Sequence, residues 1–369
     1  MEKTGIHLTV SLLSDMFRSN WRLQSERNSR MKCKKELMGL SALLILFFHL
    51  YIPFTTSALE LSLQRSAYIG VDLFFFLSAY SLGRKTKINW RAFFQNRFCV
   101  IYLPFVLFAV FAFFYQGWKF KRLLEVVSGV EFLRRGGGSF LWFFPGMFLF
   151  YFMTPLWLRV KEAFSKSGLL VMLMGWLLLA VFVQFVLKQN QLLLLIHRMP
   201  IFFLGLYYEE GKALIPEKWK IPVLIGLLVV GSFLMYRYGA IVKLNKPLRD
   251  FYYIVAIPFE LAVVGFCDRI SVGKEAAREN AFFAEAQGKG LLSKALRLVG
   301  TITLELYALQ MIVGYNLEGA LLTWIKNGQV SFVLTCAILM ALSYGLCRIK
   351  NLTMIWISER KKNLGKKEC

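Results

Sequence analysis

The stretch LLVMLMGWLLLAVFVQFVL, residues 169–187, decides the class of fold. It carries no charged side chain, and as a helix it would reach roughly 28 Å, close to the ~30 Å hydrocarbon core of a bilayer. Similar runs occupy residues 223–236 and 332–347. Of the 369 residues, 57% are hydrophobic, whereas soluble domains contain roughly 45–50%. The sequence therefore predicts an all-α fold, a polytopic transmembrane helical bundle.

The apolar runs predict about ten membrane spans, and an even number places both termini on the same side. The expected ranges are 38–56, 67–83, 99–116, 140–157, 168–187, 190–208, 221–236, 251–267, 298–315 and 329–347. With the N-terminus in the cytoplasm, 32 of the 45 Lys and Arg residues lie in cytoplasmic segments. Because basic residues concentrate on the cytoplasmic side of membrane proteins, we expect both termini there. The five basic residues of the 117–138 loop are an exception on the outer side.

The net charge of +23 is explained by this topology, so we expect no nucleic-acid partner. The chain has six cysteines without a CxxC pair, which indicates free thiols, and its three histidines do not favour a metal site. Residues 1–34 form a cytoplasmic lead-in, either an amphipathic segment or a misassigned start. Residues 35–350 form the membrane domain, and residues 351–369 form a basic cytoplasmic tail.

His49 lies in SALLILFFHLYIPF, residues 41–54, where its neighbours are apolar. It is expected roughly 16 Å from the cytoplasmic edge of the first span, near the middle of the membrane. Ionisable groups at this depth are costly and are therefore candidates for function. The structural alternative is a hydrogen bond between helices.

Asp72 lies in GVDLFFFLSAYSL, residues 70–82, near the outer end of the second span. Because adjacent spans run antiparallel, Asp72 is expected to approach the depth of His49. A carboxylate that orients an imidazole raises its basicity, so the pair is a candidate catalytic unit. The alternative is that Asp72 caps the second helix.

Basic residues at the cytoplasmic ends of the first three spans are candidates for binding an anion. Lys35 lies on nearly the same helical face as His49, and GRKTKINWRAFFQNR, residues 83–97, combines Arg91 and Arg97 with aromatic residues. Such groups suit a phosphate-rich ligand that contains a nucleotide. The alternative is an ordinary cytoplasmic loop with interfacial aromatic residues.

Six motifs, in their order along the chain, resemble those of the membrane-bound acyltransferase-3 family. The resemblance covers about residues 35–350 and rests on GLSALLILFFH (39–49), GVDLFFFLSAYSL (70–82), FFQNRFCVIYLP (93–104), LWFFPGMFLFYFMTPL (141–156), RMPIFFLGLYYEEG (198–211) and GTITLELYALQ (300–310). Members of this family have ten spans. They transfer acyl groups, usually acetyl, from cytoplasmic acyl-CoA to saccharides or lipid-linked glycans.

The resemblance implies roles for the residues named above. His49 would act as general base or transient acyl carrier with Asp72 orienting it, in an O-acyltransferase of the cell membrane. Lys35, Arg91 and Arg97 would bind acyl-CoA, with acetyl-CoA as the usual donor. The substrate-binding residues would be Tyr151, Arg198 and Glu305. Besides the glycan acceptor, only membrane lipids are expected as partners; the oligomeric state stays open.

Three positions depart from the family pattern. Met38 and Val100 stand where the family has arginines, and Gln310 stands where it often has histidine. Lys35 would replace the first arginine only as a point charge, without the bidentate fork. Two alternatives therefore remain: a proton-coupled transporter that uses His49, Asp72 and Glu305, or a degenerate relative that binds without catalysis.

Overall fold

The computed structural model describes residues 31, 33–50, 63–85, 88–239, 252–279 and 290–365. These residues form helices joined by short turns, with no strand among them, so the predicted all-α fold is confirmed. The lead-in 1–30, the predicted continuation of the first span to residue 56, and the last four residues lie outside the described ranges.

The described residues of the first half form eight α-helices with three short irregular turns between them. They are α2 (Lys34–His49), α4 (Ile69–Gly83), α5 (Trp90–Arg97), the π-helical turn η1 (Phe98–Tyr102), α6 (Leu103–Gln116), α7 (Phe120–Val127), α8 (Val130–Arg135), η2 (Gly136–Gly138), α9 (Phe143–Phe164), η3 (Ser165–Ser167) and α10 (Gly168–Val181).

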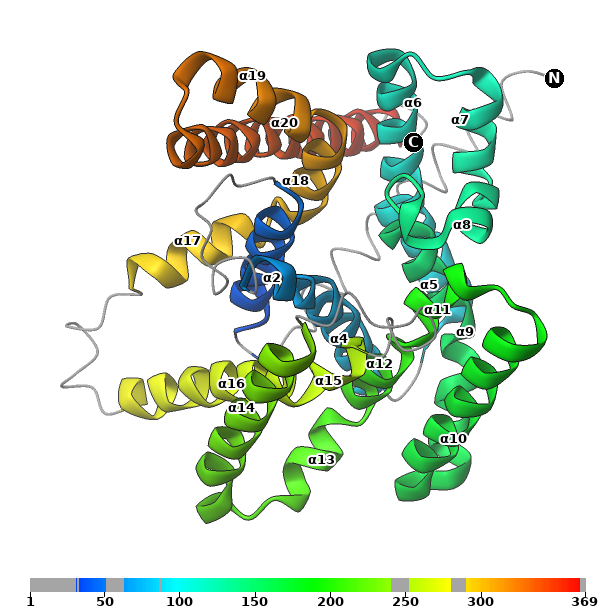
Figure 1. Cartoon of the computed structure of the whole chain (residues 1–369), viewed down its shortest axis with the longest axis vertical. Coiled ribbons are helices and arrows are strands. Elements are labelled where there is room, and N and C mark those ends of the chain that lie inside the picture. The colour runs from blue at the N-terminus through cyan, green and yellow to red at the C-terminus, as the bar shows by residue number, and fades with distance from the viewer. Residues whose placement is uncertain are drawn as a thin grey trace.

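The described residues of the second half add two bent pairs of helices, a helical hairpin and a long C-terminal helix. Its elements are η4 (Phe182–Val186), α11 (Asn190–Ile196), α12 (Met199–Leu206), α13 (Tyr208–Leu214), α14 (Glu217–Gly239), α15 (Tyr252–Val255), α16 (Ile257–Glu279), α17 (Leu291–Val299), α18 (Thr303–Leu309), η7 (Gln310–Gly314), α19 (Tyr315–Ile325) and α20 (Gly328–Gly365). In Figure 1, three groups of helices surround the central α2, α4 and α12.

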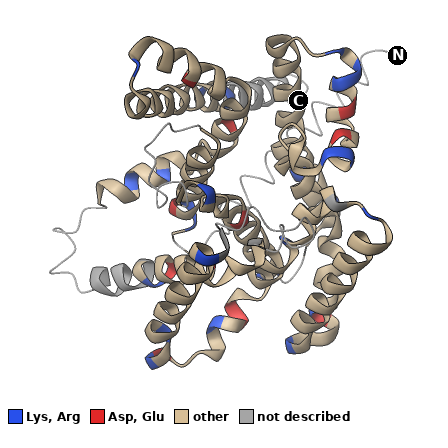
Figure 2. Cartoon of the chain, viewed as in Figure 1, with Lys and Arg blue, Asp and Glu red and all other residues tan. Residues whose placement is uncertain are grey.

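Within the described residues, five helical segments are long and apolar enough to cross a membrane, or up to seven if each bent pair counts as one span. Figure 2 shows the long stretches of ribbon without charged residues that these segments provide. One segment, Phe143–Val186, contains α9 and α10, which lie side by side and cover two of the predicted spans. The count of ten and the cytoplasmic termini stay predictions.

Helix α4 lies at the centre of the bundle. In its most apolar stretch 72% of the residues are buried, whereas only 11% are buried in the span at Glu217–Arg237. A helix that is apolar on all sides is stable either in a protein core or in lipid. Both environments are represented in this chain. Helix α4 is enclosed by protein, whereas α14 exposes apolar side chains such as Val229 and Phe233.

Small residues let the central helices approach closely. A Cβ atom on Gly205 of α12 would lie 2.6 Å from the carbonyl oxygen of Phe76 in α4, and one on Gly83 would lie 2.3 Å from that of Leu206. On the other side of α4, a Cβ atom on Gly70 would lie 2.4 Å from the Ser41 carbonyl oxygen in α2. These contacts fix α4 between α2 and α12, as glycine does between membrane helices in general.

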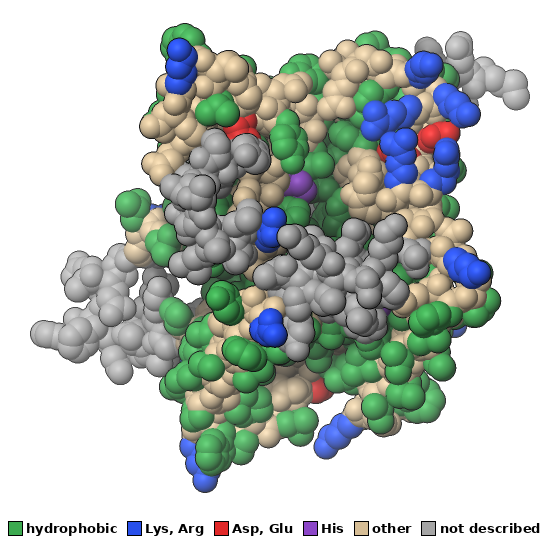
Figure 3. Space-filling view, viewed as in Figure 1, with side chains coloured by type: hydrophobic (Ala, Val, Ile, Leu, Met, Phe, Trp, Pro, Cys, Tyr) green, Lys and Arg blue, Asp and Glu red, His purple; other side chains and the backbone are tan. Residues whose placement is uncertain are grey.

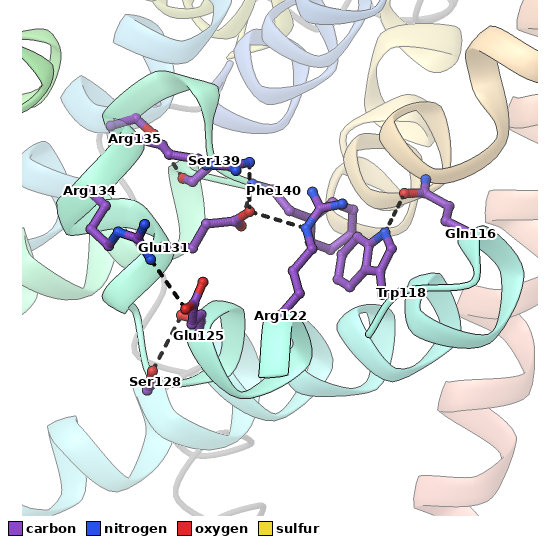
Figure 4. Close-up of polar contacts among 11 residues, drawn as sticks. Gln116, Trp118, Arg122, Glu125, Ser128, Glu131, Arg134, Arg135, Ser139 and Phe140 are labelled. Carbon is purple, nitrogen blue, oxygen red and sulfur yellow. Dashed lines mark hydrogen bonds and ion pairs between the residues drawn. The ribbon is translucent and has the colours of Figure 1, made fainter. Parts of the chain in front are cut away.

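Helix α2 ends at His49, and residues 51–56 of the predicted first span lie outside the described ranges. One part of the predicted secondary structure is wrong. Residues 117–138 were expected as a loop, but they contain α7 and α8, which present basic side chains at the upper right of Figure 3. Buried Glu131 joins these helices, because its carboxylate pairs with Arg122 at 3.2 Å and Arg135 at 3.4 Å (Figure 4).

We expect Gly205→Ala to destabilise the protein. The added Cβ would meet backbone atoms of α4 that cannot move cheaply, an overpacking cost of about 1–3 kcal/mol. The higher helix propensity of alanine would offset at most ~1 kcal/mol of that cost. Thermal unfolding in detergent, followed by tryptophan fluorescence, should therefore show a lower midpoint.

Gly175→Ala in α10 is the matched control, because nothing lies within 4 Å of its added Cβ. This variant should unfold at the wild-type temperature or slightly above it. If both variants shifted equally, the close crossing of α4 and α12 would not limit stability.

Candidate functional site

His49 is the last residue of α2, and its side chain is half-buried. Nδ1 lies 2.9 Å from the carbonyl oxygen of Ile45. A carbonyl oxygen only accepts, so in the neutral imidazole Nδ1 carries the proton and donates it to this bond. Nε2 then carries the lone pair, which is the form a general base requires.

Asp72 and Arg198 form an ion pair inside the bundle. Nε of Arg198 lies 2.7 Å from Oδ1 of Asp72, and the two side chains are 2% and 1% exposed. Asp72 lies in the first turn of α4, and Arg198 directly precedes α12 at the break after α11. A buried charge without a partner is very costly, so this pair joins the two helices.

Glu260 in the first turn of α16 is a third member of this cluster. It is also 1% exposed, its two carboxylate oxygens have no hydrogen-bond partner among the described residues, and its charge interacts with those of Asp72 and Arg198. Two ionised carboxylates beside one guanidinium would leave a negative charge uncompensated in the apolar core. We therefore expect the two carboxyls to share one proton, which leaves one negative charge opposite the single charge of Arg198.

Two aromatic rings enclose the Arg198 guanidinium. Its central carbon lies 3.7 Å from the ring centre of Tyr253 in α15 and 5.0 Å from that of Trp142, just before α9. Such cation–π contacts strengthen when water is excluded. Sequence reasoning missed Glu260, Trp142 and Tyr253 as partners of Arg198; the one available signal was the carboxyl of Glu260 within an apolar stretch.

The predicted pairing of Asp72 with His49 is not present. His49 bonds to Ile45 within its own helix, and Asp72 pairs with Arg198. The register of the helices explains this result: Gly70 faces Ser41 and Ile45, so Asp72 and His49 lie on opposite sides of the contact, separated by roughly 12 Å along the axes. The Asp72 oxygens also make no hydrogen bond to a backbone N–H group among the described residues, so the structure does not support the alternative that Asp72 caps the helix.

Arg97 and Tyr151 lie together, although the sequence predicts that Arg97 binds acyl-CoA and that Tyr151 binds the acceptor substrate. The Arg97 guanidinium carbon lies 4.5 Å from the ring centre of buried Tyr151 and 5.2 Å from that of Phe93. The Nε atom of Arg97 is buried without a hydrogen-bond partner among the described residues. Arg91 and Lys35 are exposed.

Glu305 pairs with Lys350 of α20 and is itself buried. One of its carboxylate oxygens thus makes a polar contact between helices α18 and α20. Its other oxygen, Oε2, is buried without a hydrogen-bond partner within the described part of the chain.

Gln310 begins the π-helical turn η7, which packs against α2. Its amide oxygen and nitrogen are both buried and have no hydrogen-bond partner in the described ranges. Buried polar groups are nearly always satisfied, and π-turns often occur at functional sites. Gln310 is therefore a candidate for binding a substrate, and its position in the late motif was the signal available in the sequence.

We expect Arg198→Ala to destabilise the protein strongly, by about 3–5 kcal/mol, because it leaves the buried carboxyls uncompensated. Glu260→Gln should change stability by less than ~1 kcal/mol, since its amide can donate to Asp72 in place of the shared proton. Thermal unfolding in detergent measures both effects.

Arg159→Ala is the matched control for the loss of an arginine, because Arg159 is exposed on α9. It should stay within about 0.5 kcal/mol of the wild type. A Glu260→Gln protein as unstable as Arg198→Ala would contradict the shared proton and would require both carboxyls to be ionised.

The family model described as an acyltransferase domain matches residues 37–348, most of the chain. Searches of curated proteins and of solved structures find no significant match. The matched range contains the α2–α4–α12 centre, the buried Asp72–Arg198 pair and His49. The resemblance seen in the sequence motifs is thus confirmed, and the chain belongs to the acyltransferase-3 family.

Proposed function

We propose that this protein is an integral membrane O-acyltransferase. It moves an acyl group, acetyl being the usual one in the family, from acyl-CoA to a hydroxyl of a saccharide or lipid-linked glycan. The family membership makes it an acyltransferase, and the candidate membrane spans agree with a membrane location. The proposal assumes that the protein lies in the cell membrane, crosses it ten times and has both termini in the cytoplasm.

The state of His49 is the observation that carries the proposal. The bond from Nδ1 to the Ile45 carbonyl holds the imidazole and leaves the lone pair on Nε2. In a triad, a carboxylate orients the histidine; here a backbone carbonyl takes that place. A carbonyl stabilises a charged imidazolium less than a carboxylate does, so His49 would be a weaker base than a paired histidine.

The proposed step is a direct transfer. Nε2 of His49 accepts the proton of the acceptor hydroxyl while its oxygen attacks the thioester carbonyl carbon. The tetrahedral intermediate collapses, the carbon–sulfur bond breaks, and the CoA thiolate leaves. The imidazolium returns its proton to that thiolate, so the histidine ends neutral.

The donor is assigned to the basic groups at the predicted cytoplasmic end of the bundle. The buried Nε of Arg97 has no hydrogen-bond partner among the described residues, and its guanidinium lies against the ring of Tyr151, so Tyr151 is reassigned to the donor side. Lys35 and Arg91 are exposed charges that can reach phosphates. Arg198 is engaged with Asp72 and therefore supports the site, whereas Gln310 and the free Glu305 oxygen support acceptor binding.

A proton-coupled transporter is the second candidate, and one observation favours it. Two buried carboxyls, those of Asp72 and Glu260, lie near the single charge of Arg198 inside the bundle, an arrangement that suits a proton carrier. Substrate movement that depends on pH, without consumption of acyl-CoA, would favour this candidate over acyl transfer.

We expect His49→Ala to reduce turnover by at least ~10²-fold, the usual contribution of a general base. The measurement follows labelled acetyl-CoA in nanodiscs that contain a mixed glycan-lipid extract, with release of CoA and label in the lipid recorded together. Size-exclusion profiles and unfolding midpoints establish that the variant is folded.

Phe48→Ala is the matched control, because Phe48 is exposed and its ring lies edge-on to His49, with ring centres 5.1 Å apart. It removes local bulk but no basic nitrogen and should retain most of the turnover. Full activity in a folded His49→Ala protein would make the histidine structural and remove the basis of this mechanism.

Arg97→Gln should raise the KM for acetyl-CoA by roughly tenfold with a smaller effect on kcat, since a charged contact to phosphate is worth about 1.5–3 kcal/mol. Arg159→Gln removes an equal charge from an exposed position of α9 and should leave KM unchanged. An unchanged KM in both variants would place the donor phosphates elsewhere.

A further inference from the structure

A cleft of about 900 Å³ opens at the end of the bundle where α4 finishes. Its walls come from the C-terminal part of α9, from α13, from the first turns of α14 and from the middle of α16. Ligand cavities in proteins measure roughly 300–1,000 Å³, so this cleft can hold a sizeable molecule.

The inner part of the cleft is apolar. Leucine side chains from five different helices line it, namely Leu158, Leu169, Leu204, Leu227 and Leu261. These five side chains are buried or half-buried. This part can accept an apolar chain but offers little to a polar molecule.

The mouth of the cleft is charged, with an excess of cations. Six Lys or Arg residues and four Asp or Glu residues line it. Lys161 pairs with Glu210 at 2.7 Å, Lys212 pairs with Asp268, and Lys220 and Arg269 share Glu217 at 2.6 and 2.5 Å. Two positive charges are thus in excess, and exposed Lys166 has no ion pair among the described residues.

The helices that form the walls face lipid. Only 17% of the residues are buried in the most apolar stretch of Phe143–Val186, and 11% in that of Glu217–Arg237. Exposed Leu170 of α10 and Ile225 of α14 belong to these outer surfaces. A cleft between two lipid-facing helices borders the bilayer and can be filled from it.

The cleft lies far from His49. Gly83 lines it, and Lys34, at the other end of α2 from His49, bonds to Ser81 of α4. The fifteen-residue rise of α2 between Lys34 and His49 corresponds to roughly 22 Å. The cleft therefore lies apart from His49, at the end of the bundle that also carries the proposed donor-binding residues Lys35, Arg91 and Arg97.

We propose that this cleft is a binding site for an anionic phospholipid of the adjacent leaflet, which the charge distribution predicts to be the cytoplasmic one. The phosphodiester lies at the cationic mouth near Lys166, and an acyl chain follows the leucines inward. Attraction between basic groups and anionic lipids is strongest at such a membrane boundary. The site is independent of the proposed acyl transfer and would remain if the protein showed no turnover.

The test measures retention of lipid by the full-length purified protein. Protein in detergent is titrated with phosphatidylglycerol or phosphatidylcholine, and bound lipid is counted by native mass spectrometry together with the shift in unfolding midpoint. We expect phosphatidylglycerol to bind and to raise the midpoint, and phosphatidylcholine to bind at least fivefold more weakly.

Two pairs of variants locate the site. Lys166→Glu should weaken phosphatidylglycerol binding at least fivefold, whereas Lys294→Glu, at an exposed lysine of α17 outside the cleft, should not. Leu227→Trp should block the apolar part, whereas Val229→Trp, on the lipid-exposed side of the same helix, should bind normally.

Each alternative outcome overturns the proposal. Equal binding of the two lipids would remove the role of the charged mouth. Normal binding by both cleft variants would place the lipid elsewhere. Displacement of phosphatidylglycerol by acetyl-CoA in the wild type, lost in Lys166→Glu, would make the cleft a donor site and not a lipid site.

Discussion

The ion pair between Asp72 and Arg198 is the constraint around which the centre of the protein is arranged. Both groups lie among apolar helices where water cannot solvate them, so each must stay next to its partner or carry a large desolvation cost. Because Arg198 stands at the break between α11 and α12, the pair fixes where that break occurs. Glu260 and Tyr253 extend the same constraint to α16 and α15.

Close helix packing makes this arrangement possible. Without side chains at Gly70, Gly83 and Gly205, the backbones of α2 and α12 lie directly against α4. That approach sets the register of the helices, and the register decides which polar groups meet. The register of α12 against α4 brings Arg198 to Asp72. The register of α2 against α4 places His49 away from Asp72, and the imidazole bonds to its own helix instead.

The two ends of the bundle differ in chemistry. At the end where α2 finishes, η7 packs against α2 and carries Gln310, whose amide has no hydrogen-bond partner within the described ranges. At the opposite end, a cleft lined by more basic than acidic residues opens between helices with exposed apolar surfaces. The proposed site of acyl transfer at His49 and the proposed lipid site are thus separated by about the length of α2, roughly 22 Å.

The sequence by itself determined the fold class and the family. Hydrophobic runs such as residues 169–187 and motifs such as GVDLFFFLSAYSL are local features, so they can be recognised without knowing the fold. Only the tertiary structure decided the partners: Arg198 and not His49 for Asp72, Arg97 for Tyr151, and Lys350 for Glu305. The interaction partners of a side chain depend on helix register and on contacts between residues far apart in the chain. Neither can be predicted from the spacing of residues within a single segment.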